Sequence, residues 1–415
     1  MNNSASTKQG PLHGYKILDL TAVVVGPYAT QIMGDLGAEI IRLESPIGDI
    51  VRRTGFSPPN DPNSEFGTLY MTLNRNKRSI VLDLKKPESA PALRALIEWA
   101  DVLIHNIRPQ AIERLGYGYE QVKAINPQII YTHIVGFGSD GPYSGIAAYD
   151  DTVQAISGAA SLITYMDGDP QPRNVNTLIA DKTTALHALY AVLAALLHRE
   201  RTGEGQHVEV PMFESVVSYL LPEHLAGAVW EPSRGPMSYP RTSHAHNRPF
   251  KTQDGYLAIM PYVDKHWRDL LGAGEADLSH LMDNDPRFET IAKRRLHMAE
   301  LSVILETIMV TRTTKQWAAF FIDHDIPFMN VHTLESLMED EHLAAVNFFE
   351  HHVHPPTDET YIAMRHPVIF SETPTSIRSH PPGLGQDGRV ILADMGMDTD
   401  VIEQLVAAGV LLGSE

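Results

Sequence analysis

Strand-like and helix-like segments alternate along the first 135 residues of the chain. Five short apolar segments have the composition of buried strands, at residues 15–21, 38–44, 79–84, 101–106 and 129–135. Helix-like segments lie between some of them, at residues 27–36, 88–100 and 119–125. Such alternation predicts an α/β fold with a mainly parallel sheet and helices on both faces. Ligands of such sheets usually bind beyond the carboxyl ends of the strands.

The length of the chain predicts more than one domain, because 415 residues exceed the roughly 250–300 at which a single hydrophobic core stops growing. Prolines interrupt the region from 220 to 250, which we interpret as a linker. A strand-like segment at 255–260 and helical patterns after it indicate a smaller α+β domain. We therefore expect a large α/β domain at 1–217, linkers and the small domain at 218–330, and a return to the large domain at 331–415.

Charge and composition argue against several classes of function. The net charge of −18 disfavours a general surface for nucleic acid or anionic lipids, so an anionic ligand needs a local basic pocket. The chain contains no cysteine, which removes thiol nucleophiles, disulfides and iron–sulfur clusters. The first residues are polar, and the longest apolar run, 188–197, is shorter than the ~20 residues of a membrane helix. We expect a cytoplasmic protein that binds neither nucleic acid nor membrane.

Asp181 begins a helix-like segment in which leucines recur at helical spacing, namely Leu186, Leu189, Leu193, Leu196 and Leu197. An aspartate at this position is expected to cap the helix, and the free amides of the first turn would keep its carboxylate ionised. An ionised carboxylate can also attack an activated acyl carbon and form a covalent acyl intermediate. The spacing leaves both interpretations open and favours simple capping, since aspartate is among the commonest capping residues.

Three cations, Arg75, Lys77 and Arg78, stand close together just before a predicted strand of this acidic chain. A solvated loop explains such a cluster as well as a phosphate-binding edge for a nucleotide-like cofactor does. Arg108 and Arg114, which follow another predicted strand, strengthen the second interpretation because guanidinium groups pair well with phosphate oxygens.

Other cofactor sites are not indicated. The segment 23–27 is not a GxGxxG motif, and Pro27 lacks an amide for a pyrophosphate, so we expect no nicotinamide or flavin. The histidines at 244–246 and 351–354 lack a further ligand at a recognised spacing, so we expect no metal. The GxSxG elbow of serine hydrolases is absent from the sequence.

Several short motifs occur in the order that characterises one enzyme family: LDLT at 18–21, LGAEIIRLE at 36–44, NKRSI at 76–80, GFG at 136–138, ADKTT at 180–184 and RERTGEGQ at 199–206. With these motifs the chain resembles the family III CoA-transferases, most closely over residues 14–215. That family includes formyl-CoA:oxalate and carnitine CoA-transferases and also α-methylacyl-CoA racemases.

The resemblance implies a Rossmann-like large domain and places the family's nucleophilic aspartate at Asp181. Asp181 would attack an acyl-CoA thioester, giving an aspartyl–acyl anhydride and the CoA thiolate. The thiolate would return to form an aspartyl-CoA thioester, and an acceptor acid would be activated through a second anhydride. Coenzyme A would thus be a substrate, and similar proteins form an interlocked homodimer.

The resemblance also implies contacts between coenzyme A and the large domain. Carried over residue by residue, they are Val23, Val24, Leu82, Lys85, Asn106 and Arg114, and we also expect Arg42 to bind the cofactor. The phosphate-binding interpretation adds a second set of cations, namely Arg75, Lys77, Arg78 and Arg108.

Tyr149 and Asp150 match a tyrosine–acid pair beside the nucleophile of the transferases. The racemases carry a histidine where this chain has Tyr149, and a phenol is a poor proton shuttle at neutral pH, which favours a transferase. An acyl-CoA racemase or epimerase remains the alternative. A non-catalytic acyl-CoA-binding protein is a third possibility.

Departures from the oxalate enzyme bear on the substrate. Ser45 and Val24 stand where that enzyme carries an arginine and a glutamine, so oxalate and formate are not expected. Arg241, His244 and Arg248 would suit the distal carboxylate of a dicarboxylate acceptor, although solvated cations in a loop explain them at least as well.

Overall fold

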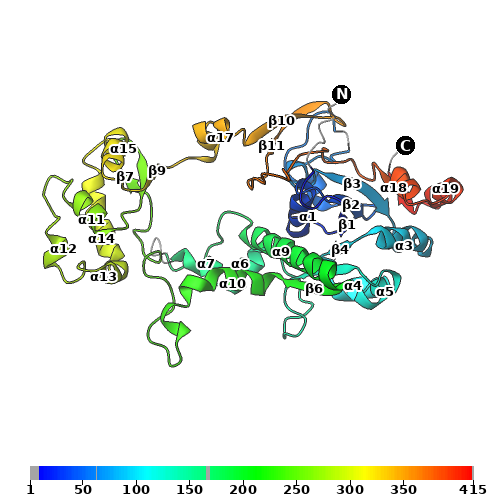
Figure 1. Cartoon of the computed structure of the whole chain (residues 1–415), viewed down its shortest axis with the longest axis horizontal. Coiled ribbons are helices and arrows are strands. Elements are labelled where there is room, and N and C mark those ends of the chain that lie inside the picture. Colours follow the sequence, from blue (N-terminus) through cyan, green and yellow to red (C-terminus); the bar gives the residue numbers. More distant parts are fainter. Residues whose placement is uncertain (1–8, 62, 165–168, 414–415) are drawn as a thin grey trace. The chain divides into compact units, whose positions relative to one another are not determined.

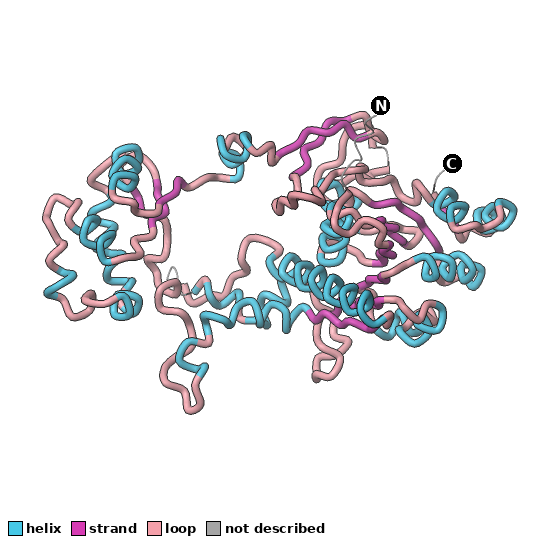
Figure 2. The backbone as a smooth tube through the Cα atoms, viewed as in Figure 1, coloured by secondary structure: helices cyan, strands magenta, loops and turns pink. Residues whose placement is uncertain are grey.

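The computed structural model describes residues 9–61, 63–164 and 169–413, and its chain divides into two compact units. The large unit comprises Met1–Val153, Thr177–Val216 and Glu341–Glu415, and the small unit comprises Gln154–Asn176 and Val217–Asp340. Figure 1 follows the chain from end to end, and Figure 2 distinguishes its helices, strands and loops. Within the described residues, no helix combines the length and the apolar composition that crossing a membrane requires.

A seven-stranded sheet forms the centre of the large unit, in the order β12-β3-β2-β1-β4-β5-β6. Strands β1 to β6 pair in parallel, and only β12 pairs antiparallel, with β3. The predicted α/β fold with a mainly parallel sheet is confirmed. The order from β3 to β6 is that of the Rossmann fold, which reverses direction between β1 and β4. The strands are β1 (Lys16–Leu20), β2 (Glu39–Glu44), β3 (Lys77–Leu82), β4 (Val102–His105), β5 (Ile130–Val135), β6 (Gln206–Pro211) and β12 (Leu411–Leu412).

Helices cover both faces of this sheet. On one face, α1 (Val25–Asp35) packs against β1, β2 and the long helix α9 (Ile179–Thr202), and α9 packs against β5 and β6. On the other face, α3 (Ala90–Trp99) packs against β1 and against α5 (Tyr119–Ile125), and α18 (Gly388–Asp394) packs against β3. The last helix, α19 (Thr399–Ala407), packs against α18 and β12.

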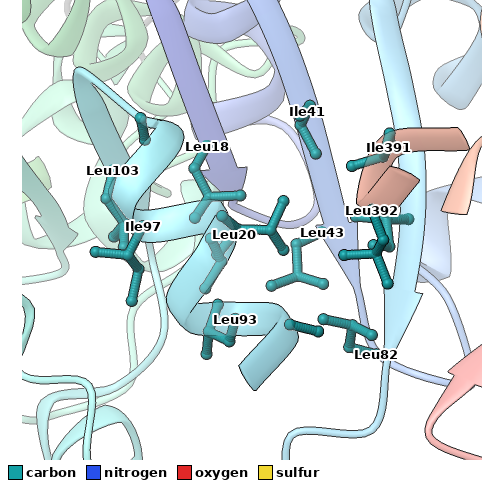
Figure 3. Close-up of a cluster of buried hydrophobic side chains, with 14 of the residues drawn as sticks. Leu18, Leu20, Ile41, Leu43, Leu82, Leu93, Ile97, Leu103, Ile391 and Leu392 are labelled. Carbon is teal, nitrogen blue, oxygen red and sulfur yellow. The ribbon is translucent and has the colours of Figure 1, made fainter. Parts of the chain in front are cut away.

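Alternate side chains of the strands build the core beneath α3 and α18. Leu18 and Leu20 of β1 lie on one face of the sheet because successive strand residues point to opposite faces. Figure 3 shows them close to Leu93 of α3 and to the equivalent leucine of β2, Leu43. Ile391 and Leu392 of α18 complete the same cluster, which explains why the C-terminal segment belongs to the large unit.

The buried face of α9 consists mainly of small side chains, together with Leu196. Ala185, Ala188 and Val192 are buried, whereas Leu186 and Leu197 are 49% and 52% exposed. The predicted helix is present, but its leucines are divided between the buried face and the exposed face. Small residues let α9 approach α1 and the sheet closely, which leaves Leu186 and Leu197 on the outer face.

Shorter elements complete the large unit. They are η1 (Ile50–Arg53), α2 (Thr68–Leu73), η2 (Pro87–Ser89), α4 (Pro109–Arg114), α17 (Glu341–Ala345) and the antiparallel hairpin of β10 (Phe349–His354) and β11 (Glu359–Met364). The helices α6 (Asp150–Ser157) and α10 (Met212–His224) begin in the large unit and end in the small one.

The small unit has its own hydrophobic core, in which Trp267, Phe288, Trp317 and Phe321 are almost fully buried. Its antiparallel sheet has the order β7-β8-β9, with β7 (Phe250–Lys251), β8 (Tyr256–Ile259) and β9 (Phe328–Asn330). Its main helices are α11 (Asp264–Leu271), α12 (Leu281–Asn284), α13 (Ile291–Leu296), α14 (Met298–Met309) and α15 (Thr314–Asp323). Shorter helices are α7 (Ala159–Leu162), η3 (Ala226–Val229) and α16 (Leu334–Leu337).

Candidate active site

A pocket of about 270 Å³, here called the Asp181 pocket, opens where the strand order reverses. Its walls come from the loops that follow β1 and β4, from the end of β5 and from the loop at 144–149. Asp181 of α9, Glu209 of β6 and Met212 of α10 also line it. The position agrees with the general rule that doubly wound sheets bind ligands at the switch point, beyond the carboxyl ends of their strands.

The Asp181 carboxylate is buried and does not cap α9. The helix begins at Ile179, and Leu178, at the N-cap position, makes no side-chain capping bond, so capping by Asp181 is a wrong prediction. Asp181 is 8% exposed, and within the described residues its carboxylate has neither a hydrogen bond nor an ion pair. Its backbone amide instead donates a hydrogen bond of 2.9 Å to Oδ1 of Asp150.

Burial, together with the smaller effect of the nearby Asp150 and Asp151 carboxylates, raises the pKa of Asp181 to about 7. The expectation of a fully ionised aspartate is therefore wrong. The free amides of the helix terminus favour the ionised form, but the desolvation and the two like charges outweigh them and favour the protonated form. Near neutral pH, Asp181 exchanges between its protonated and ionised states.

The structure brings Tyr149 and Asp150 to Asp181. Tyr149 lines the Asp181 pocket and is 65% exposed, and its amide donates a hydrogen bond of 2.9 Å to Oγ1 of Thr152. This bond stands at the beginning of α6, whose first residue is the buried Asp150. One helix start therefore carries both members of the predicted pair.

The loop after β1 is held in place from two sides. Asn106 accepts a hydrogen bond from the Ala22 amide and donates one to the Ala22 carbonyl, each of 2.9 Å. Oδ2 of Asp49 accepts a hydrogen bond of 2.9 Å from the Val23 amide. Val23 has φ of +70°, a left-handed conformation that is costly for a β-branched residue. These contacts keep Val23 and the buried Val24 in the lining of the Asp181 pocket.

A second pocket of about 510 Å³, here called the adjoining pocket, shares Ala22 and Ile107 with the Asp181 pocket. The ends of β1, β2 and β3 line it, including the predicted contacts Leu82, Lys85 and Arg42. Lys85 is exposed, and its ammonium has no acidic partner within the described residues. The same holds for Arg108, which lines the Asp181 pocket.

Three other predicted cations form ion pairs with buried carboxylates. Arg42 pairs with Glu44 and Asp49, although its residue borders the adjoining pocket. Arg75 and Lys77 line neither pocket, since they bind acids of β1 and α1. The Nη2 of Arg75 lies 2.7 Å from Oδ2 of Asp35, and the Nζ of Lys77 lies 3.1 Å from Oδ2 of Asp19.

The structure therefore does not place the cations of 75–78 at either pocket. Burial lowers the pKa of Lys77 to about 8 although Asp19 opposes this shift, and a buried ammonium of this kind is out of reach of a phosphate. Arg78 pairs with Asp394 at 2.7 Å. Arg114 is exposed, donates to the carbonyl of Gln110 at 3.1 Å and lines neither pocket.

The sequence reasoning missed several residues of the site. Asp49 holds the loop after β1 through the Val23 amide, and Asp151 raises the pKa of Asp181. His133 and Glu209 also line the Asp181 pocket, from β5 and β6. Their positions in the second halves of parallel strands, at the edge where ligands bind, were the available signal. In the described part of the chain, no cluster of three or more metal-ligating side chains occurs.

The arrangement suits nucleophilic attack by a carboxylate. A buried, unpaired Asp181 faces a small pocket, and the raised pKa indicates an ionised form that its surroundings destabilise. Such a group is more basic than an exposed aspartate and gains stability when it forms a neutral covalent bond.

Comparison with known proteins gives a consistent result. Residues 12–388 match CoA-transferase family III. The chain is 33% identical to an acyl-CoA transferase of Fusarium pseudograminearum, over 98% of this chain and 90% of that protein. It is 32% identical to succinyl-CoA:glutarate CoA-transferase of Mus musculus, over 97% and 90%. The crystal structure of a CAIB/BAIF family protein from Brucella suis superposes with a TM-score of 0.75 at 29% identity, covering 94% of this chain and all of that one.

Proposed function

The chain belongs to CoA-transferase family III, and we propose that it moves coenzyme A from an acyl-CoA to a carboxylic acid with Asp181 as the nucleophile. The observation that carries the proposal is the buried Asp181 carboxylate, unpaired within the described residues, in a pocket at the switch point of the sheet. The family alone supports the transferase activity, and the geometry of Asp181 supports the covalent route.

Each proposed step exchanges one acyl bond for another. An oxygen of Asp181 attacks the thioester carbon, the C–S bond breaks, and the CoA thiolate leaves with the electron pair. The thiolate attacks the Asp181 carbonyl of the anhydride, releasing the donor acid and leaving an aspartyl-CoA thioester. The acceptor carboxylate attacks this thioester, and the thiolate then attacks the acceptor carbonyl of the second anhydride. The products are the new acyl-CoA and the free Asp181 carboxylate.

The charges around Asp181 favour the covalent intermediates. Burial and the carboxylates of Asp150 and Asp151 disfavour the ionised Asp181. Both the anhydride and the thioester are neutral at this position, so acylation removes the unfavourable charge. The same surroundings that raise the pKa of Asp181 therefore make its ionised form a better nucleophile and stabilise its acylated forms.

The two neighbouring pockets, which share Ala22 and Ile107, suit the two ends of coenzyme A. The thioester would reach the Asp181 pocket, and the nucleotide end would occupy the adjoining pocket, whose lining includes Leu82, Leu84 and Leu115. Lys85 and Arg108 are the exposed cations of these linings, and we propose that they bind phosphate oxygens. Arg42, Arg75 and Lys77 would act indirectly, by holding the surrounding structure.

We propose a short dicarboxylate as the acceptor. One similar protein is named for succinyl-CoA and glutarate, and another, from Agrobacterium fabrum, is named for succinate and glutarate at 30% identity over 94% of this chain. The Asp181 pocket is small, and Val23, Val24 and Val25 give it apolar surface, which suits a short carbon chain.

A homodimer is part of the proposal. On the outer face of α9, Leu186, Tyr190 and Leu197 lie at helical spacing and are each about half exposed or more. A continuous apolar stripe of this kind is typical of a surface that another chain covers. Light scattering after size-exclusion chromatography should give twice the chain mass of 46.0 kDa, and charged substitutions at Leu186 and Tyr190 should shift the protein toward monomer.

Trapping of the intermediates tests the chemistry. The protein is incubated with succinyl-CoA, treated with hydroxylamine, and its peptides are analysed by mass spectrometry. A hydroxamate on Asp181 is expected, and Asp181→Ala should lack both the hydroxamate and CoA transfer to glutarate. Lys182→Gln, which changes the exposed next residue of α9, is the matched control and should transfer CoA normally. Full transfer by Asp181→Ala would refute the proposed nucleophile.

A further inference from the structure

The small unit contains a cavity of about 450 Å³ whose charged lining is entirely basic, here called the small-unit cavity. Four arginines line it, Arg241, Arg248, Arg294 and Arg295, together with His244 and His246, and no aspartate or glutamate does. Its residues come from the 239–250 loop, from β8 and the residues after it, and from helices α11, α13 and α14. A basic cavity is unexpected in a chain of net charge −18, so an explanation is needed.

Two of the four arginines form ion pairs with acids that lie outside the cavity lining. Arg248 pairs with Glu306 of α14 at 2.9 Å, and Glu306 also contacts His246 at 3.1 Å. Arg294 pairs with Asp264 at the beginning of α11. Both acids are outside the lining. These two positive charges are therefore balanced within the small unit.

The other two arginines have no such partner. Within the described residues, Arg241 and Arg295 make no ion pair, and the Arg241 guanidinium lies 3.9 Å from Met260 Sδ and beside the ring of Tyr239. Both side chains are partly buried. Two uncompensated guanidinium groups beside one cavity raise the local positive potential and favour a bound anion.

Arg294 is a further donor of the cavity wall that the protein leaves incompletely paired. Its residue is 1% exposed, and its guanidinium is bound by Asp264 and, at 2.7 Å, by the carbonyl of Phe288. Its Nε–H nevertheless has no hydrogen-bond partner among the described residues. Buried donors are nearly always satisfied, so the acceptors of the small unit do not match all the donors beside this cavity.

The remaining walls are apolar and select among anions. Phe250, Ile259, Met260, Trp267 and Met298 line the cavity beside the arginines. Inorganic phosphate would gain nothing from such walls, whereas an organic acid buries its carbon chain against them. Guanidinium groups bind carboxylates through two parallel hydrogen bonds.

We propose that the small-unit cavity is a binding site for a short organic dicarboxylate, held by Arg241 and Arg295. The two uncompensated charges match a dianion, and the volume accommodates a small organic acid. The residues of this cavity and those of the Asp181 pocket are different. The inference rests on the small unit alone and does not require acyl transfer by Asp181.

Methionine methyl groups report on the two sites separately. Met260 and Met298 line the small-unit cavity, and Met212 lines the Asp181 pocket. The full-length Asp181→Asn protein, labelled with ¹³C-methyl methionine, is titrated with glutarate and followed by NMR, with assignments from single Met→Leu variants. We expect glutarate to shift the Met260 and Met298 signals. Glutaramide, the uncharged analogue, and inorganic phosphate should bind at least about tenfold more weakly.

Substitutions on one helix give the matched comparison. Arg295→Gln should weaken glutarate binding at least about tenfold, and so should Arg241→Gln on the loop. Lys293→Gln, on the same helix as Arg295 but paired with Glu289 and outside the lining, should leave binding unchanged. The proposal is overturned if glutarate shifts only Met212 or no methyl group. Equal binding of phosphate or glutaramide, or equal weakening by Lys293→Gln, also overturns it.

Discussion

Oδ1 of Asp150 accepts a hydrogen bond of 2.9 Å from the backbone amide of Asp181. The bond joins the first residue of α6 to the first turn of α9, so Asp150 satisfies an amide that the helix itself leaves free. It also places a carboxylate beside the Asp181 carboxylate and raises its pKa. Asp150 therefore stabilises the first turn of the helix and also raises the pKa of the proposed nucleophile.

The raised pKa of Asp181 makes the stability of the protein depend on pH. Between the ordinary value of 3.8 and the folded value of about 7, the folded chain keeps a proton that the unfolded chain releases. Stability therefore falls as the pH rises through this window. Asp181→Asn cannot ionise, so it should raise the free energy of unfolding by roughly 2 to 4 kcal/mol above pH 7. Urea denaturation near pH 8 and pH 5 tests this, and an equal gain at both would contradict it.

Asp150→Asn should separate the two roles of Asp150. The amide oxygen still accepts the Asp181 N–H, but the negative charge is gone, so the pKa of Asp181 should fall. Because the ionised form attacks, the acidic limb of the kcat/KM profile should move to lower pH. Asp151→Asn should move it less, since Asp151 contributes less to the shift. Asp150→Ala should in addition lose about 1 kcal/mol of stability with the capping bond. An unchanged profile in Asp150→Asn would refute this coupling.

Much of the sheet was predictable because buried parallel strands are continuous apolar runs. The predictions at 15–21, 38–44 and 129–135 enclose β1, β2 and β5. β6 was not predicted, since its residues Gln206–Pro211 alternate in polarity and are mostly only half-buried. Leucine spacing along α9 predicted the helix but not its buried face, because the close packing uses Ala185 and Ala188 while Leu186 and Leu197 stay exposed.

The site was less predictable than the fold. Asp181 and Asp150 were identified through the resemblance, and their contact joins residues 31 apart in sequence. Asp19 lies 58 residues from Lys77 in the sequence, and Asp35 lies 40 from Arg75, so no local pattern shows that these cations are neutralised. Asp49, which holds the Val23 amide, was not identified for the same reason, because the two residues lie 26 apart in the sequence.

Because the backbone of Val23 is left-handed, the usual order of stability of alanine and glycine variants should be reversed at this position. With φ of +70°, valine and alanine both carry a strain of roughly 1–2 kcal/mol that glycine lacks. Val23→Gly should therefore be at least as stable as Val23→Ala, whereas glycine ordinarily costs about 0.5–1 kcal/mol more. At Val24, where φ is −124°, the glycine variant should be less stable than the alanine variant, as is usual. Urea denaturation measures all four variants, and a less stable Val23→Gly would rule out strain at this position.

The positions of the cations lead to a test that separates ligand binding from structural support. Lys85→Gln and Arg108→Gln should each raise the KM for acyl-CoA about three- to tenfold with little change in kcat, because each removes an exposed cation from a pocket lining. Lys86→Gln is the matched control, since Lys86 lies outside both linings and donates to the carbonyls of Ala408 and Gly409.

Arg75→Gln completes this test because it breaks a buried ion pair with Asp35. It should lower the free energy of unfolding by about 3–5 kcal/mol, as expected when one partner of a buried pair is removed, without a selective rise in the KM for acyl-CoA. Steady-state kinetics with varied acyl-CoA and urea denaturation of the same variants give both quantities. If Arg75→Gln instead raised the KM and left stability unchanged, the phosphate-binding interpretation of residues 75–78 would be correct and the assignment to Lys85 and Arg108 would fail.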